Sequence, residues 1–140
     1  MPAAAEPTVV VDGNNVIGAV PDGWWRDRPA AVRRLLGRLR CHAAAAGARA
    51  PVVLVLDVPQ ADLPEGDHGG VTVLYARRRG RDAADDRIAD LVTGPDAALG
   101  AGPIEVVTSD RGLADRVGGR PGLTVTGARA YLARLTAAGC

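Results

Sequence analysis

Short runs of β-branched and aliphatic residues alternate along the chain with segments in which apolar residues recur every three or four positions. The near-continuous apolarity of the short runs is typical of strands that are covered on both faces, as in a parallel sheet. We expect four such strands, at residues 8–11, 52–56, 71–74 and 104–108, and a fifth at residues 123–126.

The periodic segments predict amphipathic helices between and after these strands. The first carries Leu35, Leu36 and Leu39 at helical spacing. Alternation of strands with helices predicts an open, doubly wound α/β sheet. The expected helices cover residues 29–46, 83–92, 112–117 and 128–138.

A chain of 140 residues falls at the commonest size for one domain. The Gly/Pro-rich loops at residues 59–70 and 94–103 are too short to link separate domains. We therefore expect one domain over residues 1–140, with residues 1–7 as a disordered tail. Phe is absent and aromatic residues are only 3%, so Val, Leu, Ile and Ala must fill the core.

Charge and composition exclude several classes of protein. Seventeen basic and sixteen acidic residues give a net charge of +1, so only local patches could attract nucleic acid or anionic lipid. The chain starts without a basic stretch, and no apolar run approaches the roughly 20 residues of a membrane span. We expect a cytoplasmic protein without a membrane partner.

Cysteine and histidine offer no obvious chemistry. Cys41 and Cys140 have no neighbour at a metal-ligand spacing such as C-x-x-C, and we expect neither a disulfide nor a zinc role for them. His42 and His68 are far apart in sequence. Any catalysis must therefore rest on carboxylates.

Aspartates recur where the predicted strands end. Asp12, Asp57 and Asp110 each follow one of the apolar runs. The carboxyl ends of parallel strands form one edge of an open α/β sheet, and ligands bind there. Asp is also common in turns and at helix N-caps, so each position alone has an ordinary structural explanation. The recurrence at three strand ends favours a shared site.

The predicted helix at residues 83–92 adds further acids. Asp85 lies on the rim of its buried face, whereas Asp86 points nearly the opposite way. Acids in a first helical turn also stabilise the helix by about 0.3–1 kcal/mol each, and we accept that role for Asp82 and favour it for Asp86. We expect Asp85 to face the site.

Carboxylates gathered in this way indicate a divalent cation. Two of them about 4 Å apart repel by roughly 4 kcal/mol at an effective dielectric near 20. Asp oxygens without His or Cys suit a hard ion, Mg²⁺ or Mn²⁺, which keeps several waters and is usually shared with substrate phosphate. Such an ion supports phosphoryl chemistry without a covalent nucleophile.

Three segments resemble the signature of the NYN branch of PIN-like ribonucleases, in its bacterial single-domain form. The D-G-x-N opening is matched by VDGNNVIG at residues 11–18. An A-D-[DE]-x-I helix start is matched by ADDRI at residues 84–88, and a V-x-T-[SA]-D strand end by VTSDR at residues 107–111. The resemblance implies a three-layer α/β/α sandwich with a mostly parallel central sheet of four or five strands. It also implies Mg²⁺- or Mn²⁺-dependent cleavage of single-stranded RNA.

Site roles follow from this resemblance residue by residue. Asp12, Asp85 and Asp110 would bind metal and act in catalysis. Asn15 would orient a carboxylate or contact substrate, and Ser109 would support Asp110 or contact substrate. Further candidate metal ligands are Asp86, acting through water, and Asp57. Whether one or two metal ions bind is left open by the absence of Glu from that helix.

Basic and aromatic residues near the expected site suggest RNA contacts. Arg77, Arg78, Arg79 and Arg81 link the third strand to the Asp85 helix and are candidates for phosphate binding, or form a solvated loop. Trp24, which precedes the first helix together with a second tryptophan, could stack on a base or pack as a hydrophobic lid.

The leading hypothesis is a metal-dependent endoribonuclease that hydrolyses phosphodiester bonds in single-stranded RNA. One alternative is a hydrolase of nucleoside triphosphates or small phosphate esters at the same metal edge. Another is a non-catalytic RNA-binding or ribosome-associated module. RNA is the expected partner, a protein or the ribosome is a further candidate, and the oligomeric state is left open.

Overall fold

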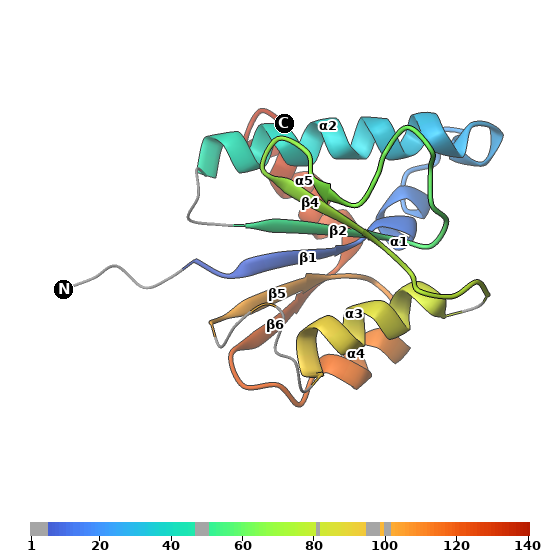
Figure 1. Cartoon of the computed structure of the whole chain (residues 1–140). Helices are drawn as coiled ribbons and strands as arrows, with labels where there is room; N and C mark the ends of the chain where they lie inside the picture. The colour runs from blue at the N-terminus through green and yellow to red at the C-terminus, as the bar shows by residue number, and fades with distance from the viewer. Residues whose placement is uncertain (1–5, 47–50, 81, 95–98, 100–101) are drawn as a thin grey trace.

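The computed structural model describes residues 6–46, 51–80, 82–94, 99 and 102–140. Over these residues the chain forms a six-stranded sheet in the order β3-β4-β2-β1-β5-β6 (Figure 1). All neighbouring pairs are parallel except β3 with β4. The strands are β1 (Thr8–Asp12), β2 (Val52–Leu56), β3 (Gly66–Asp67), β4 (Val71–Tyr75), β5 (Ile104–Val107) and β6 (Leu123–Thr126).

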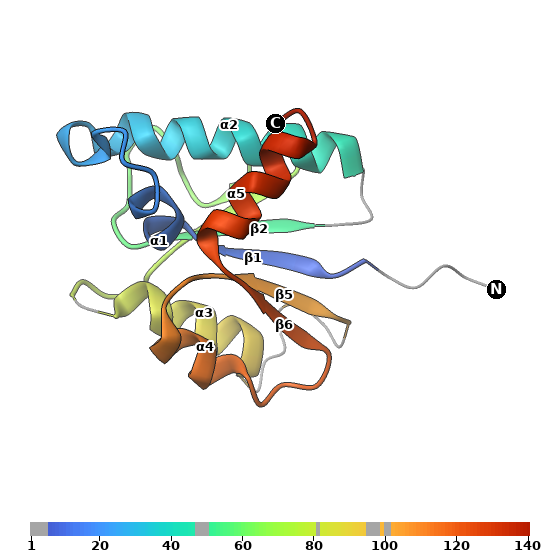
Figure 2. The same ribbon diagram turned by 180° about the vertical axis from the view of Figure 1, so that it is seen from behind.

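Helices cover both faces of this sheet, which gives the three-layer α/β/α sandwich that the sequence predicts (Figures 1 and 2). One face carries α1 (Gly13–Gly18), α2 (Arg28–Ala46) and α5 (Ala128–Ala137). The other carries α3 (Ala83–Thr93) and α4 (Arg111–Val117). A short 3₁₀ helix, η1 (Trp24–Arg26), precedes α2.

Alternate residues of the central strands enter different cores. In β1, Val9 and Val11 pack with α1, α2 and α5, while Val10 packs with α3 and α4. Successive side chains of a strand point to opposite faces, so an unbroken apolar run fits a strand with helices on both sides. The prediction of doubly covered strands is therefore confirmed for the centre of the sheet.

Two short elements differ from the prediction. The described residues hold six strands instead of four or five, because the two-residue β3 adds an antiparallel edge within the expected loop at 59–70. Residues 13–18, part of the segment read only as a motif, form helix α1. Neither element is long enough to show a periodic pattern of its own.

The expectation for the cysteines was wrong, because Cys41 and Cys140 form a disulfide with 5.7 Å between their Cα atoms. Helices α2 and α5 lie on the same face of the sheet and bring the end of the chain onto α2 (Figure 2). Arg38 strengthens this contact, since its Nε donates to the carbonyl of Cys140 at 3.1 Å.

Two further expectations concern the N-terminal tail and membrane spans. Residues 1–5 of the expected tail lie outside the described residues, and Glu6 and Pro7 precede β1 without regular structure. None of the described helices combines the length and the apolarity that crossing a bilayer would require.

Candidate functional site

The carboxyl ends of β2, β1 and β5 meet the start of α3 at one edge of the sheet (Figure 1). Asp12 is the last residue of β1 and is level with Val55 of β2. Asp57 comes directly after β2, and Asp110 caps the N-terminus of α4 after β5. Three acids from distant parts of the sequence are therefore placed on neighbouring strand ends.

These acids and Asp85 line one cavity of about 260 Å³, here called the acid cavity. Asp12, Asp85 and Asp110, which the sequence analysis expects at one edge of the sheet, thus line the same cavity, together with Asp57. The complete lining is Asp12, Asn14, Asn15, Asp57, Gly80, Asp82, Ala83, Ala84, Asp85 and Asp110.

Asp12 is the most buried of these acids, with 4% of its surface exposed. Burial, only partly opposed by a hydrogen bond from Thr108, raises the pKa of Asp12 from 3.8 to about 6. The charges of Asp85 and Asp110 raise this pKa as well. The carboxylate of Asp12 is therefore held in an environment that favours either a proton or a nearby cation.

Asp85 shows the same crowding from the side of α3. Burial raises its pKa, and the charges of Asp110 and Asp82 raise it further. Asp82 lies just before α3 with a φ of 62°, in the left-handed region. Non-glycine residues with such backbone angles are uncommon and concentrate at functional sites. The sequence analysis assigned Asp82 only the role of a charge that stabilises the first turn of a helix. That interpretation was incomplete, because Asp82 also lines the acid cavity.

Thr108 connects two of the acids and was not anticipated from the sequence. Its hydroxyl donates to Asp12 Oδ2 at 2.8 Å and accepts from the backbone N–H of Asp110 at 3.1 Å. Asp110 in turn accepts from the backbone N–H of Leu113 at 3.0 Å. This chain of hydrogen bonds fixes the relative positions of the two carboxylates. The T-[SA]-D motif contained the signal, but the supporting residue is the threonine.

The two asparagines of the opening motif have separate tasks. Asn15 Oδ1 accepts from the backbone N–H of Ser109 at 2.7 Å and so joins α1 to the end of β5. Asn14, which sequence reasoning missed, binds Asp57 twice: its amide donates to Asp57 Oδ1 at 2.8 Å and its oxygen accepts from the Asp57 N–H at 3.0 Å. Asn14 therefore anchors the strand end that carries Asp57.

Ser109 contacts a different element from the one expected. Its hydroxyl accepts from the backbone N–H of Ala128 at 2.9 Å, at the start of α5, and the residue lines a neighbouring cavity with Arg129. It supports the position of α5, whereas Thr108 supports the acids.

Asp86 points away from the acid cavity. It forms ion pairs with Arg78 and with Arg116, the latter at 2.8 Å. Hydrogen bonds from these two arginines lower the pKa of Asp86. Asp86 is not among the residues that line the acid cavity. Arg78, a candidate for phosphate binding, instead donates a hydrogen bond to Asp86.

Of the remaining basic and aromatic candidates that the structure describes, none lines the acid cavity. Arg77 and Arg79 are exposed in the link between β4 and α3, where Arg79 directly precedes Gly80 of the cavity lining, and Arg81 lies outside the described residues. Trp24 is half-buried against the core around α2, while Trp25 has 58% of its surface exposed. One tryptophan thus packs and the other does not.

The oxygen ligands that the acid cavity offers suit a hard cation, but they do not surround one completely. Within the described parts of the chain, no three His, Cys, Asp or Glu side chains already stand close enough to hold a metal ion between them. Mg²⁺ is usually bound through one or two carboxylates together with waters and substrate phosphate. The all-oxygen donors and the crowded, buried Asp12 match that type of site.

Comparison with known proteins supports the fold. No protein-family model matches the chain, and no curated protein matches it in sequence. Two crystal structures of Rae1 (YacP) from Bacillus subtilis, one of them a point mutant, are similar to it with 26% sequence identity and a TM-score of 0.73. The match covers 94% of this chain and 76% of the mutant or 75% of the other chain. The fold is therefore shared with Rae1 (YacP) over nearly the whole length of this chain.

Proposed function

We propose that this protein is a metal-dependent endoribonuclease that hydrolyses phosphodiester bonds in single-stranded RNA. The observation that carries the proposal is the convergence of Asp12, Asp85 and Asp110 on one cavity, where burial, and after it the charges of neighbouring acids, raises the pKa values of Asp12 and Asp85. The likeness to Rae1 (YacP) and the three PIN-like motifs support a nuclease-type fold.

The residues of the acid cavity would bind the metal ion and position one another. Asp12, Asp85 and Asp110 would hold Mg²⁺ or Mn²⁺, directly or through water, and Thr108 would keep Asp12 and Asp110 in register. When bound, the ion would neutralise the crowded acids, polarise a phosphate oxygen and make a water easier to ionise. Asn15 would fix the floor of the cavity at the end of β5.

Phosphate recognition would come from the link between β4 and α3. Arg79 directly precedes Gly80, which lines the acid cavity, and Arg77 is two positions before Arg79; both arginines are exposed. Guanidinium groups there would bind phosphates on either side of the scissile bond, because charge-assisted contacts with phosphate are among the stronger hydrogen bonds. Such contacts would compensate for the nearly neutral charge of the whole chain.

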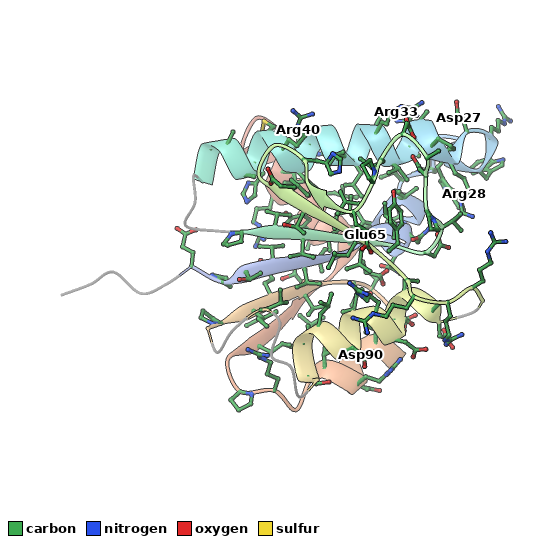
Figure 3. All side chains as sticks on the ribbon, viewed as in Figure 1. Asp27, Arg28, Arg33, Arg40, Glu65 and Asp90 are labelled. Atoms are coloured by element: carbon green, nitrogen blue, oxygen red, sulfur yellow. A yellow bond between two sulfur atoms is a disulfide. The ribbon has the colours of Figure 1, made fainter. Side chains whose placement is uncertain are left out.

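A cleavage assay with matched variants tests this function. The purified chain should cut labelled single-stranded RNA with Mg²⁺ or Mn²⁺ and stop when the ion is chelated. Asp85→Asn should lower the rate by more than about 100-fold while RNA still binds. Asp90→Asn, the same change on the exposed side of α3, should leave the rate unaltered (Figure 3).

The outcomes also separate the alternatives. Turnover of nucleoside triphosphates with RNA left intact would favour a small-molecule phosphohydrolase. Equal and undetectable cleavage by the wild type and Asp85→Asn, with both ions and varied RNAs, would favour a non-catalytic RNA-binding module.

A further inference from the structure

A second cavity, of about 310 Å³, adjoins the acid cavity near the start of α2. The two cavities share Asn14 and Asp57, whose paired hydrogen bonds form part of the wall between them. We call this space the Trp24 cavity after its aromatic side chain; Arg28, Val32, Pro59 and Gln60 also line it. Its volume lies at the lower end of the roughly 300–1,000 Å³ range of small-ligand sites.

An aromatic ring and a cation stand together at this cavity. The guanidinium carbon of Arg28 lies 5.6 Å from the centre of the Trp24 ring, a cation–π contact. The same guanidinium is 3.6 Å from Asp57 Oδ2, and Asp57 lines both cavities. The cavity thus holds an indole and a guanidinium, the two kinds of planar group on which unpaired bases stack.

A buried acceptor without a partner lies in the same lining. The side-chain Oε1 of Gln60 is shielded from solvent and accepts no hydrogen bond within the part of the chain that the structure describes. Buried polar atoms in proteins nearly always have a partner, since an unsatisfied one is unfavourable by about 1–3 kcal/mol. Because the oxygen is shielded from solvent, the Gln60 amide must turn toward the cavity before an N–H group on the edge of a ligand can supply the missing donor.

We propose that the Trp24 cavity binds one unpaired nucleobase of the RNA whose phosphate occupies the acid cavity, an inference that rests on the proposed function. Base and phosphate of one nucleotide are joined through a single sugar, so adjoining cavities can hold both. The base stacks on Trp24 and donates from its edge to Gln60. Every nucleobase has a π face, so this subsite selects unpaired RNA more than it selects sequence.

Equilibrium binding tests the subsite without cleavage. The probes are a fluorescein-labelled uridine hexamer and the same ribose-phosphate hexamer without bases, and the protein is the full chain carrying Asp85→Asn in Mg²⁺. Trp24→Leu should weaken binding of the uridine hexamer by about 5- to 150-fold, the range for loss of one base stack. Trp25→Leu, the neighbouring and more exposed tryptophan, should change it less than about 2-fold.

The base-free hexamer makes the test independent of any general damage to the protein. Trp24→Leu should change the dissociation constant of the base-free hexamer by less than about 2-fold. Comparing the two RNAs with the two proteins then measures the coupling between the base and the indole, because removing either one alone should remove the same interaction. Gln60→Leu should weaken only the base-bearing RNA, by about 2- to 13-fold. Equal losses for both hexamers, equal effects of the two tryptophan variants, or no measurable binding of either RNA would overturn the proposal.

Cleavage rates of the unmodified active site separate this inference from the proposed function. If RNA is cut in an Asp85-dependent manner but Trp24→Leu behaves like Trp25→Leu, the subsite is wrong and the nuclease stands. If no RNA is cut and the base-dependent binding through Trp24 persists, the subsite stands and the nuclease is wrong.

Discussion

At the scale of single residues, the acid cavity is an arrangement that opposes folding stability when no cation is present. Asp12 has only 4% of its surface exposed and shares the cavity with two acids that raise its pKa. A group whose charged form is disfavoured in the native state destabilises that state wherever the group is ionised. The Asp12 carboxylate is therefore expected to destabilise the metal-free protein, although the proposed function needs it to bind the cation.

Replacing this carboxylate should stabilise the metal-free protein. The pKa of Asp12 rises from 3.8 to about 6 on folding, so Asp12→Asn should add up to roughly 2–3 kcal/mol to the free energy of unfolding at pH 7.5. The wild type loses this stability as the pH rises through the window from 3.8 to about 6, and the variant lacks the carboxyl group that is responsible. The gain should therefore shrink as the pH falls through this window and vanish below about pH 3.8.

Urea denaturation in the presence of a chelator, at pH 7.5 and at about pH 4, measures both differences. The amide can still accept the hydrogen bond from Thr108, so the comparison isolates the charge. A variant that is less stable than the wild type at pH 7.5 would show that burial of this charge is already compensated.

The sequence identified the acids better than their supports. Asp12 and Asp110 could be predicted because they lie at the ends of apolar runs that mark strands. Asp85 could be predicted because it lies at the edge of the apolar face of a periodic helix. Thr108 and Asn14 could not, since their roles depend on which polar atoms the fold brings within hydrogen-bond distance. The pairing of Asp86 with Arg78 and Arg116 could not be predicted either, because both arginines lie outside its own helix.

At the level of elements, segments with a periodic or unbroken apolar pattern were predictable, including the short α4 and β6, whereas α1 and β3 were not. The expected helix at residues 29–46 is confirmed as α2 with a one-residue shift at its start, whereas the six-residue α1 has glycine at both ends. Such a segment has low intrinsic helix propensity, so packing must stabilise it. Gly13 lies so close to β2 that an added Cβ would be 2.6 Å from Leu56 Cδ2 and 2.9 Å from the carbonyl oxygen of Val55.

The two glycines of α1 should respond in opposite ways to the same substitution. Gly13→Ala should destabilise the protein by about 1–3 kcal/mol, because the new methyl group would collide with the backbone of β2. Gly18→Ala, with nothing within 4 Å of the added atom, should be neutral or stabilise by up to about 1 kcal/mol.

Thermal and urea unfolding of both variants provide the measurement, with RNA cleavage as a second readout for Gly13→Ala, since α1 also carries Asn14 and Asn15. Equal stability of the two variants would mean that α1 is not held against β2 as described.

At the scale of the whole molecule, the covalent link between α2 and the C-terminus was beyond sequence reasoning. Its cysteines are 99 residues apart and match no metal or redox spacing. Their proximity follows only from the packing of α5 beside α2. Cys41 lies 13 residues after Arg28 along one helix, roughly 20 Å from the end of α2 that lines the Trp24 cavity.

Removing this link should therefore affect stability and leave the site intact. Cys140→Ser should lower the free energy of unfolding by about 2–5 kcal/mol relative to the oxidised wild type, since the disulfide closes a long loop of the unfolded chain. Reduced wild type should unfold at the same denaturant concentration as the variant. A loss of RNA cleavage by the still-folded variant would contradict the separation between this link and the acid cavity.

The proposed chemistry requires that the carboxylates at the ends of β1 and β5 and at the start of α3 bind a divalent cation together. The anomalous density of a crystal soaked in Mn²⁺ tests it most directly. We expect a peak within direct or water-mediated reach of Asp12, Asp85 or Asp110, and we expect this peak to be absent in Asp85→Asn. A saturating soak with no peak in the acid cavity, or with a peak only elsewhere on the protein, would contradict it.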